Sequence, residues 1–327
     1  MAVQELIVKT AETLHDKGFE VSKPYINEKS SINIVARSGE KLVLVKVLRD
    51  VGELKTCCAL DMKKASYALK ASPLIIGERD ESKEIETEAV YEKHGIYVVH
   101  PDALKDYLNG RKQYVYYKGG RFYVKIDGRK LKEIREKIGL SLGGLANLLG
   151  VSRKAIYEYE RDEMDATLDV ADKLYEVLRR FVGEEEALQA FKPVDLLENA
   201  IIRQGIRDYE GDALTGAKKL RLQDEVALKL LKLGFSVFKL KDAPFNLIAK
   251  KDNDKKRVIL ILTIETLKGR LREEVEILKD VAEVAKVGGL VVTRKGAYEN
   301  EEGVITSKKL ENIESPDELI EVTSLGC

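Results

Sequence analysis

The chain has 327 residues, a length that favours two or three domains over one. Hydrophobic residues make up 44% and charged residues 34%, which is typical of a globular chain with a heavily charged surface and excludes a disordered one. Three cysteines without a CxxC pair, together with three scattered histidines, exclude a disulfide framework and a zinc site spelled out by the sequence. We therefore expect no metal and no cofactor.

The chain starts with MAVQELIVKT, which lacks the basic segment and apolar run of a secretory signal. No stretch approaches the roughly 18 uninterrupted apolar residues of a transmembrane helix. These features predict a soluble, cytoplasmic protein with no membrane partner.

The net charge is zero, but the charges are unevenly distributed. Residues 111–161 hold 13 Lys or Arg against 5 Asp or Glu, a local excess of +8, so the rest of the chain carries −8. A basic segment inside an acidic chain is typical of phosphate binding and indicates a nucleic-acid partner. Chance variation along a highly charged chain is the alternative.

The first predicted domain, residues 1–110, has the pattern of an α/β unit. A helix near 6–14 is ended by Gly18, which suits a C-terminal cap. The apolar pattern then predicts, in order, strands at 32–36 and 42–47, a helix at 52–71, strands at 73–77 and 95–99, and a short helix at 101–108.

Residues 222–327 repeat this order and form the second predicted α/β domain. The repeat comprises a helix near 226–231 ended by Gly234, strands at 246–249 and 259–262, a helix at 267–286, and strands at 289–292 and 303–305. Tyr298-Glu299 precedes the last strand as Tyr91-Glu92 does in the first copy. Continuous apolar strands predict sheets covered on both faces. We interpret the repeat as a duplication; a generic order shared by many such domains is the alternative.

The segments between the copies are shorter. Residues 111–127 alternate in character around Gly119-Gly120, which predicts a β-hairpin linker. Residues 183–221 read as a helical linker with one helix near 194–203.

Residues 128–182 carry the most informative pattern, three short helices with caps. Leu131, Ile134 and Ile138 recur at helical spacing, and Ser141 and Ser152 are placed to cap the second and third helices. Gly150 suits the left-handed residue of the tight turn between those two helices. The pattern predicts a helix-turn-helix whose third helix buries Ile156 and Tyr159.

This stretch closely resembles the Cro and lambda-repressor (XRE-like) helix-turn-helix family over about 50 residues. The matching steps are Leu145-Ala146, Leu149-Gly150-Val151-Ser152 and Ile156 through Tyr159-Glu160-Arg161. The resemblance implies a third helix, about 152–161, in the major groove of double-stranded DNA. Arg153, Lys154 and Glu158 would then face base edges, where Arg reads guanine and Glu accepts from cytosine.

The resemblance also implies contacts outside the base edges. Ser152 and Tyr157 would touch phosphates, and Leu142 stands where the family often has a backbone-contacting Gln, which puts that anchor in doubt. The family's ion pair between the first and third helices maps onto Arg135 and Glu160. Three basic residues, Lys130, Lys132 and Arg161, are expected to supply phosphate contacts in place of the lost anchor. Ser141 completes the predicted DNA-binding set.

The whole layout resembles archaeal HTH-type transcriptional regulators, and the flanking repeats resemble the restriction-endonuclease and Holliday-junction-resolvase fold. That fold's nucleases hold Mg²⁺ with a helix Glu, an Asp and a Glu-x-Lys. In the first copy Glu5 and Lys46 match, but Asn33 and Leu44 replace the two strand carboxylates. The corresponding residues of the second copy are taken as Asn246, Ile261 and Thr263.

Neither copy has a complete metal site, so we expect degenerate scaffolds and no enzyme. Lys46 has an ordinary interpretation as a side chain snorkelling at a strand edge. Cys57 and Cys58 are expected to be small buried residues, with a redox switch as the alternative.

The predicted fold class is α/β plus all-α, with two restriction-endonuclease-like repeats flanking a central helical DNA-binding domain. The predicted function is a sequence-specific transcription regulator that acts as a homodimer. A metal-dependent structure-selective nuclease and a protein–protein adaptor that uses the helical unit remain the alternatives.

Overall fold

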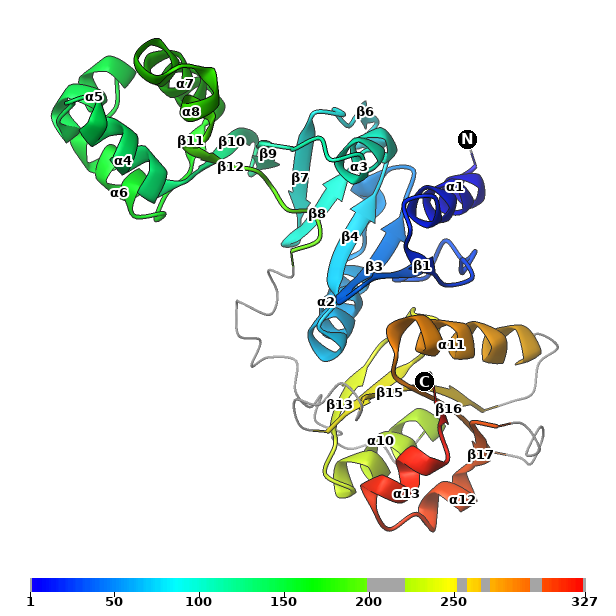
Figure 1. Cartoon of the computed structure of the whole chain (residues 1–327). Helices are drawn as coiled ribbons and strands as arrows, with labels where there is room; N and C mark the ends of the chain where they lie inside the picture. Colours follow the sequence, from blue (N-terminus) through cyan, green and yellow to red (C-terminus); the bar gives the residue numbers. More distant parts are fainter. Residues whose placement is uncertain (1, 199–220, 252–257, 266–270, 295–301, 326–327) are drawn as a thin grey trace. The chain divides into compact units, whose positions relative to one another are not determined.

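The computed structural model describes residues 2–198, 221–251, 258–265, 271–294 and 302–325 (Figure 1). Its contacts divide the chain into two compact units, Met1–Lys83 with Leu197–Cys327, and Glu84–Leu196. The domain boundaries expected near 110, 127, 182 and 221 stay predictions. The helix expected near 194–203 is not found in its first half, because residues 194–198 form coil and a turn, and its second half lies outside the described residues. The dipeptide Tyr298-Glu299 and the first residues of the helix expected at 267–286 also lie outside the described residues.

The first α/β copy occupies the N-terminal part of unit 1. Every residue of β3 after Lys41 is buried, so the strand is covered on both faces as expected. β2 and β4 flank β3, antiparallel and parallel respectively. The elements are α1 (Val3–His15), β1 (Glu20–Val21), β2 (Ile34–Ser38), β3 (Lys41–Val47), η1 (Val51–Glu53), α2 (Thr56–Leu69), β4 (Ser72–Ile76) and β5 (Arg79–Asp80); β6 (Lys83–Glu84) ends this part.

The helix expected at 52–71 is shorter in the structure. Asp50 accepts a hydrogen bond from the backbone N–H of Gly52 at 2.8 Å and caps the separate 3-10 turn η1, so α2 begins only at Thr56. Lys70 follows α2 in the left-handed conformation, with φ of 54°.

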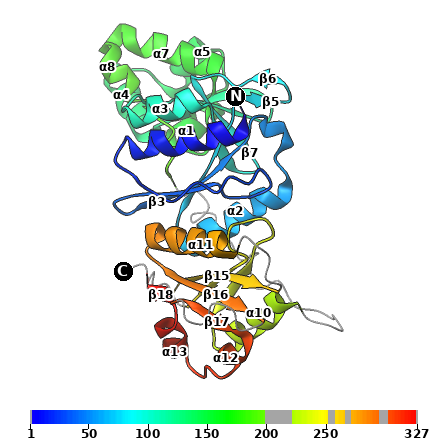
Figure 2. The same ribbon diagram turned by 90° about the vertical axis from the view of Figure 1, so that its right-hand side faces the viewer.

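The second copy has α11 on one face of its sheet and α10, α12 and α13 on the other (Figures 1 and 2). Its strands run β13-β14-β15-β16-β17, with β18 beside β16. The elements are α10 (Leu222–Lys232), β13 (Ser236–Lys239), β14 (Leu247–Lys250), β15 (Val258–Ile264), α11 (Leu271–Ala285), β16 (Gly288–Thr293), β17 (Val304–Thr306), α12 (Ser307–Glu311), α13 (Pro316–Glu321) and β18 (Ser324–Leu325).

Helix α13 was not expected, although its sequence carries a signal. Ser315 accepts from the backbone N–H of Glu318 while Glu318 accepts from that of Ser315, and Pro316 occupies the first turn. Ser-Pro-Asp-Glu is therefore a capping box that sequence reasoning missed.

The two copies share one strand register. Val43 of β3 pairs with Ser72 of β4, and Ile259 of β15 pairs with Gly288 of β16 at the same spacing. Lys286 follows α11 with φ of 55°, as Lys70 follows α2. The equivalence continues across the central strands and supports the duplication.

Within unit 1 the copies also contact one another reciprocally. The Nζ of Lys64 on α2 donates to the carbonyl of Lys239 at 3.2 Å. On the other side, Asp280 of α11 accepts from the backbone N–H of Lys23, and Arg37 of β2 donates to the carbonyl of Val284 at 2.6 Å. Each copy therefore packs its long helix against strands of the other copy, α11 against β2 and α2 against β13 and β14.

Unit 2 combines a sheet with six helices. Strands β8, β7, β9, β10 and β11 are neighbours in that order, and β12 also pairs with β10. The expected hairpin is confirmed: Gly119 and Gly120 link β9 and β10 with φ of 57° and 86°. The elements are β7 (Ala89–Lys93), β8 (Ile96–Val99), α3 (Pro101–Leu108), β9 (Val115–Lys118), β10 (Arg121–Ile126), α4 (Gly128–Lys137), α5 (Leu142–Leu149), α6 (Arg153–Glu160), β11 (Ala166–Thr167), α7 (Leu168–Val182), α8 (Glu184–Leu188) and β12 (Phe191–Lys192).

The hairpin and the helices of unit 2 share a core. Val124 and Ile126 of β10 are buried with residues of α4 to α7, and Phe191 of β12 closes the same cluster. The expected class, mixed α/β sheets together with a central helical domain, is confirmed. Among the described residues, none of the helices is both long enough and apolar enough to cross a membrane.

Candidate nucleic-acid interface

The turn between α5 and α6 has the geometry that its sequence predicts. The hydroxyl of Ser141 accepts from the N–H of Gly144 at 2.9 Å and that of Ser152 from Ala155 at 3.0 Å, so each serine caps its helix. Gly150 ends α5 in the left-handed conformation with φ of 70°. A side chain at this position would be strained, because L-residues rarely adopt such an angle.

The buried side of α6 fixes how the helix is presented. Ile156 and Tyr159 are buried against Leu145 and Leu149 of α5, as expected. Because these residues point inward, the opposite face of α6 must point to solvent. Burial raises the pKa of Tyr159.

An ion pair joins α4 to the end of α6. The guanidinium Nε and Nη2 of Arg135 donate to the two carboxylate oxygens of Glu160 at 2.5 and 3.1 Å, and Nη1 donates to the carbonyl of Leu140 at 2.8 Å. Both side chains are more than nine-tenths buried. The hydrogen bond to Glu160 raises the pKa of Arg135. The predicted structural pair is present.

The start of α4 is packed against the end of α6. A Cβ atom on Gly128 would lie 2.5 Å from the carbonyl oxygens of Tyr159 and Glu160, so only glycine fits there. Asp162 accepts from the backbone N–H of Gly128 at 2.8 Å and from the Nζ of Lys192 at 2.9 Å. Helix α6 is therefore held at its C-terminal end by α4 and by β12.

The exposed face of α6 carries the side chains expected to read bases. Arg153 and Lys154 are exposed in the first turn, and Glu158 is partly buried one turn later. The Nζ of Lys154 lies 3.4 Å from the Glu158 carboxylate. Within the described part of the chain, Arg153 has no ion-pair partner, so its guanidinium is available to a ligand.

Tyr157 and Arg161 form a pair on the same helix. The Nη1 of Arg161 donates to the Tyr157 hydroxyl at 3.2 Å, and its guanidinium carbon lies 5.4 Å from the ring centre. Arg161 is also bonded to Glu163 at 2.6 Å, so a phosphate would have to compete with that carboxylate. The hydrogen bond to Glu163 raises the pKa of Arg161.

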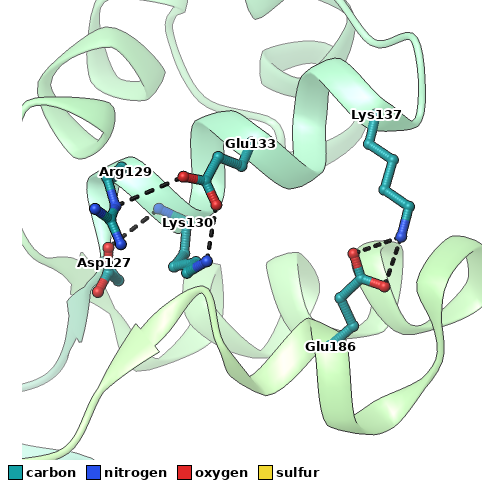
Figure 3. A network of polar contacts seen from close by, with 6 residues as sticks. All are labelled: Asp127, Arg129, Lys130, Glu133, Lys137 and Glu186. Atoms are coloured by element: carbon teal, nitrogen blue, oxygen red, sulfur yellow. Dashed lines mark hydrogen bonds and ion pairs between the residues drawn. The ribbon is translucent and has the colours of Figure 1, made fainter.

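The basic residues of α4 differ in their availability (Figure 3). Glu133 binds the Nζ of Lys130 at 2.8 Å and lies 3.6 Å from the Nε of Arg129. The hydrogen bond from Lys130 lowers the pKa of Glu133. Lys132 is exposed and, among the described residues, has no ionic partner. Arg129, which sequence reasoning did not include, is a third exposed basic side chain beside the start of the helix.

Leu142, at the position where the resembling family often has Gln, packs against the helical core. It therefore cannot supply a polar anchor. The structure places Ser141, Ser152 and α6 as the resemblance implies, while roles in DNA binding for the predicted residues stay predictions.

The nuclease-type positions of the first copy have structural roles. Asn33 accepts from the backbone N–H of Val47 at 3.0 Å and donates to the carbonyls of Tyr25 and Asn27 at 2.9 and 3.1 Å. Glu5 lies on the exposed side of α1, 3.5 Å from Lys9. Asn33 therefore stands where the nuclease fold has a metal-binding carboxylate, and its side-chain amide is hydrogen-bonded within the fold instead.

The strand residues assigned to the second copy are wrong by one position. Asn246 accepts from the N–H of Thr263 at 3.0 Å, as Asn33 does from Val47, so Thr263 corresponds to Val47. The shared register pairs Leu44 with Leu260 and Lys46 with Leu262. A shift of one residue moves a side chain to the other face of a strand, so Ile261 and Thr263 are not the counterparts of Leu44 and Lys46.

The expectation that Lys46 snorkels at an edge is also wrong. β3 is an interior strand, and Lys46 is only 1% exposed. Its Nζ donates to the carbonyl of Glu28 at 2.9 Å. Burial lowers the pKa of Lys46 to about 8, and the amine lies against Cys58.

This burial predicts a pH dependence of stability. The ordinary lysine pKa is 10.5 and the folded value is about 8, so between these values the unfolded chain holds a proton that the folded protein lacks. Lys46 should therefore contribute stability that rises with pH across this window, by roughly 3 kcal/mol in total. Relative to Lys46→Met, which lacks this group, the wild type should gain about that amount of stability between the two ends of the window. Urea unfolding in a metal-free buffer at pH 7.5, 9 and 10.5 checks this, and an equal rise in both proteins would contradict it.

Comparison with known proteins identifies two regions. The PD-(D/E)XK superfamily domain matches residues 3–113, and a helix-turn-helix family matches residues 131–180. A Pyrococcus horikoshii protein with the provisional name of an HTH-type transcriptional regulatory protein is 37% identical over 89% of this chain and 88% of its own length. Proteins of the same description from Thermococcus kodakarensis and Methanocaldococcus jannaschii are each 35% identical, over 98% and 81% of the chain and 95% and 78% of their lengths.

Proposed function

This chain belongs to the archaeal family of HTH-type transcriptional regulatory proteins, and from that premise we propose that it binds double-stranded DNA and regulates transcription. In this proposal α6 enters the major groove, where Arg153 and Lys154 meet base edges and Glu158 accepts from cytosine. Phosphates would be bound by Ser141, Ser152, Tyr157 and Arg161, and by Lys130 and Lys132 of α4.

One observation carries the proposal: the solvent-facing side of the capped helix α6 bears Arg153, which has no ion-pair partner among the described residues, in a segment with a charge excess of +8. A helix used only for protein–protein adaptation would not need this charge. The rigid supports of α6, which are its buried face and the Arg135–Glu160 pair, suit a helix that must keep its orientation on DNA.

The test is selection of bound fragments from random DNA, followed by titration of the best site with the full chain. A variant with Arg153→Ala and Lys154→Ala should lose its preference for that site. A second variant, Lys173→Ala with Arg180→Ala, removes the same charge from exposed positions of α7 and should keep the preference. Binding that ignores sequence and both variants would reject the regulator in favour of an adaptor or an architectural binder.

We also propose that the chain binds its operator as a homodimer. Two recognition helices about 34 Å apart would reach successive major grooves, which one helix-turn-helix cannot do. Phe181 on α7 is 59% exposed and Leu188 on α8 is 43% exposed, and these apolar side chains favour an intermolecular contact at this corner. A monomeric mass in light scattering, both free and on DNA, would exclude the dimer.

We propose that neither α/β copy is a working nuclease, although the first belongs to the PD-(D/E)XK superfamily. Asn33 and Asn246 are bonded to backbone groups, and leucines occupy the position of the strand Glu in both copies. We expect no cleavage of linear or branched DNA with Mg²⁺ or Mn²⁺ over hours. Metal-dependent cleavage by the wild type that is lost in Lys46→Ala would contradict this prediction.

A further inference from the structure

Two adjacent thiols of α2 face a carboxylate from the other α/β copy of unit 1. Cys57 and Cys58 lie in the first turn of α2, and Asp242 follows β13. One Sγ atom from each cysteine and a carboxylate oxygen all lie within 4.8 Å of one another. Cys58 is buried, Cys57 is half-buried and Asp242 is exposed, so one side of the cluster is open to solvent.

The carboxylate is held in place through its backbone. The N–H of Asp242 donates to the Asp61 carboxylate on α2 at 3.1 Å, and the N–H of Lys241 donates to the same oxygen at 2.9 Å. The carbonyl of Asp242 accepts from the N–H of Ser31 at 2.7 Å. These bonds fix the backbone of Asp242, so a bound cation would have to fix only the rotation of its side chain. The three ligand groups are therefore largely preorganised.

A disulfide is a poor use of these two thiols. The Cα atoms of consecutive residues are about 3.8 Å apart, whereas disulfides ordinarily need about 4.4–6.8 Å. Two neighbouring sulfurs and a carboxylate are, by contrast, ligand types that borderline-soft divalent cations accept. Burial raises the pKa of Cys58 to about 11, so a cation must displace the thiol proton when it binds.

We propose that Cys57, Cys58 and Asp242 form a site for one thiophilic divalent cation of the Zn²⁺ or Cd²⁺ type. Three protein ligands leave a fourth tetrahedral position for water. The bound cation would connect α2 of the first copy to the loop after β13 of the second, and would thereby stabilise unit 1.

The test uses the full chain and Cd²⁺ alone, because Cd²⁺–thiolate bonds give an ultraviolet charge-transfer band. We expect one equivalent to bind, with the band absent in Cys57→Ser plus Cys58→Ser. Asp242→Asn should weaken binding at least about tenfold, as the loss of a ligand requires. Cys327→Ser, which removes the third cysteine, should leave the band and the affinity unchanged. Cd²⁺ should raise the melting temperature of the wild type and of Cys327→Ser equally, raise that of Asp242→Asn less, and leave that of the double serine variant unchanged.

Several results would overturn the site. The first is that the wild type shows no thiolate band at stoichiometric Cd²⁺. The second is that the band persists in the double serine variant. The third is that Asp242→Asn binds Cd²⁺ with unchanged affinity. Asp242 is exposed, so its replacement by Asn should not prevent folding and tests the site even if the double serine variant is unstable. None of these results depends on DNA binding, so the site and the regulatory function can fail separately.

Discussion

Replacing Glu160 with alanine is expected to destabilise the helical part of unit 2 by about 3–5 kcal/mol, because the buried guanidinium of Arg135 then keeps only a longer, 3.5 Å contact to Glu136 and its bond to the Leu140 carbonyl. The lost contacts are two charge-assisted hydrogen bonds between side chains that are about nine-tenths buried. Since Arg135 also holds the carbonyl of Leu140, the loop between α4 and α5 should loosen with it.

Circular-dichroism melting of the full chain, with hydrogen exchange of α4 to α6, measures this loss. Glu133→Ala is the matched control, since Glu133 and Arg129 are exposed, Lys130 is partly exposed, and such surface pairs contribute at most about 1 kcal/mol. Similar melting curves for the two variants would show that the Arg135–Glu160 pair does not support the fold. The DNA affinity of the Glu160→Ala variant should fall only at temperatures at which α6 has lost its helical structure.

Arg153→Ala and Lys132→Ala are expected to weaken DNA binding in different ways. Arg153 lies on the exposed face of α6, and the loss of a bidentate guanine contact should cost about 1–3 kcal/mol on the selected site and relax the preference at one base position. Lys132 lies on α4, and the loss of a phosphate contact should weaken binding to all sequences alike.

Salt titration separates the two cases. Each phosphate contact adds about one to the slope of log affinity against log salt, so Lys132→Ala should reduce the slope by about one per chain. Arg153→Ala should leave most of the slope intact while lowering the ratio of specific to non-specific affinity. The reverse pattern would mean that α4, and not α6, reads the bases.

The sequence by itself determined the local structure of the DNA-binding region. Ser141, Ser152 and Gly150 specify two caps and a turn because each acts on backbone groups within a few residues. Gly119-Gly120 likewise defines the hairpin. The ion pair of Arg135 and Glu160 was predictable only through the family resemblance, because the sequence does not show which charged residues of two helices meet.

Only the tertiary structure decided the features that depend on distant segments. The residues of the second copy that were assigned to Leu44 and Lys46 from the sequence were wrong by one position. Two continuous apolar strands have no alternating pattern, so the sequence alone does not show which of two adjacent residues faces which side of the sheet. Lys46 is buried because helices α1 and α2 pack on the faces of the sheet at β3, which no local pattern reveals. Asp242 reaches Cys57 and Cys58 because Asp61 binds a backbone 180 residues away, and such long-range contacts leave no trace in residue spacing.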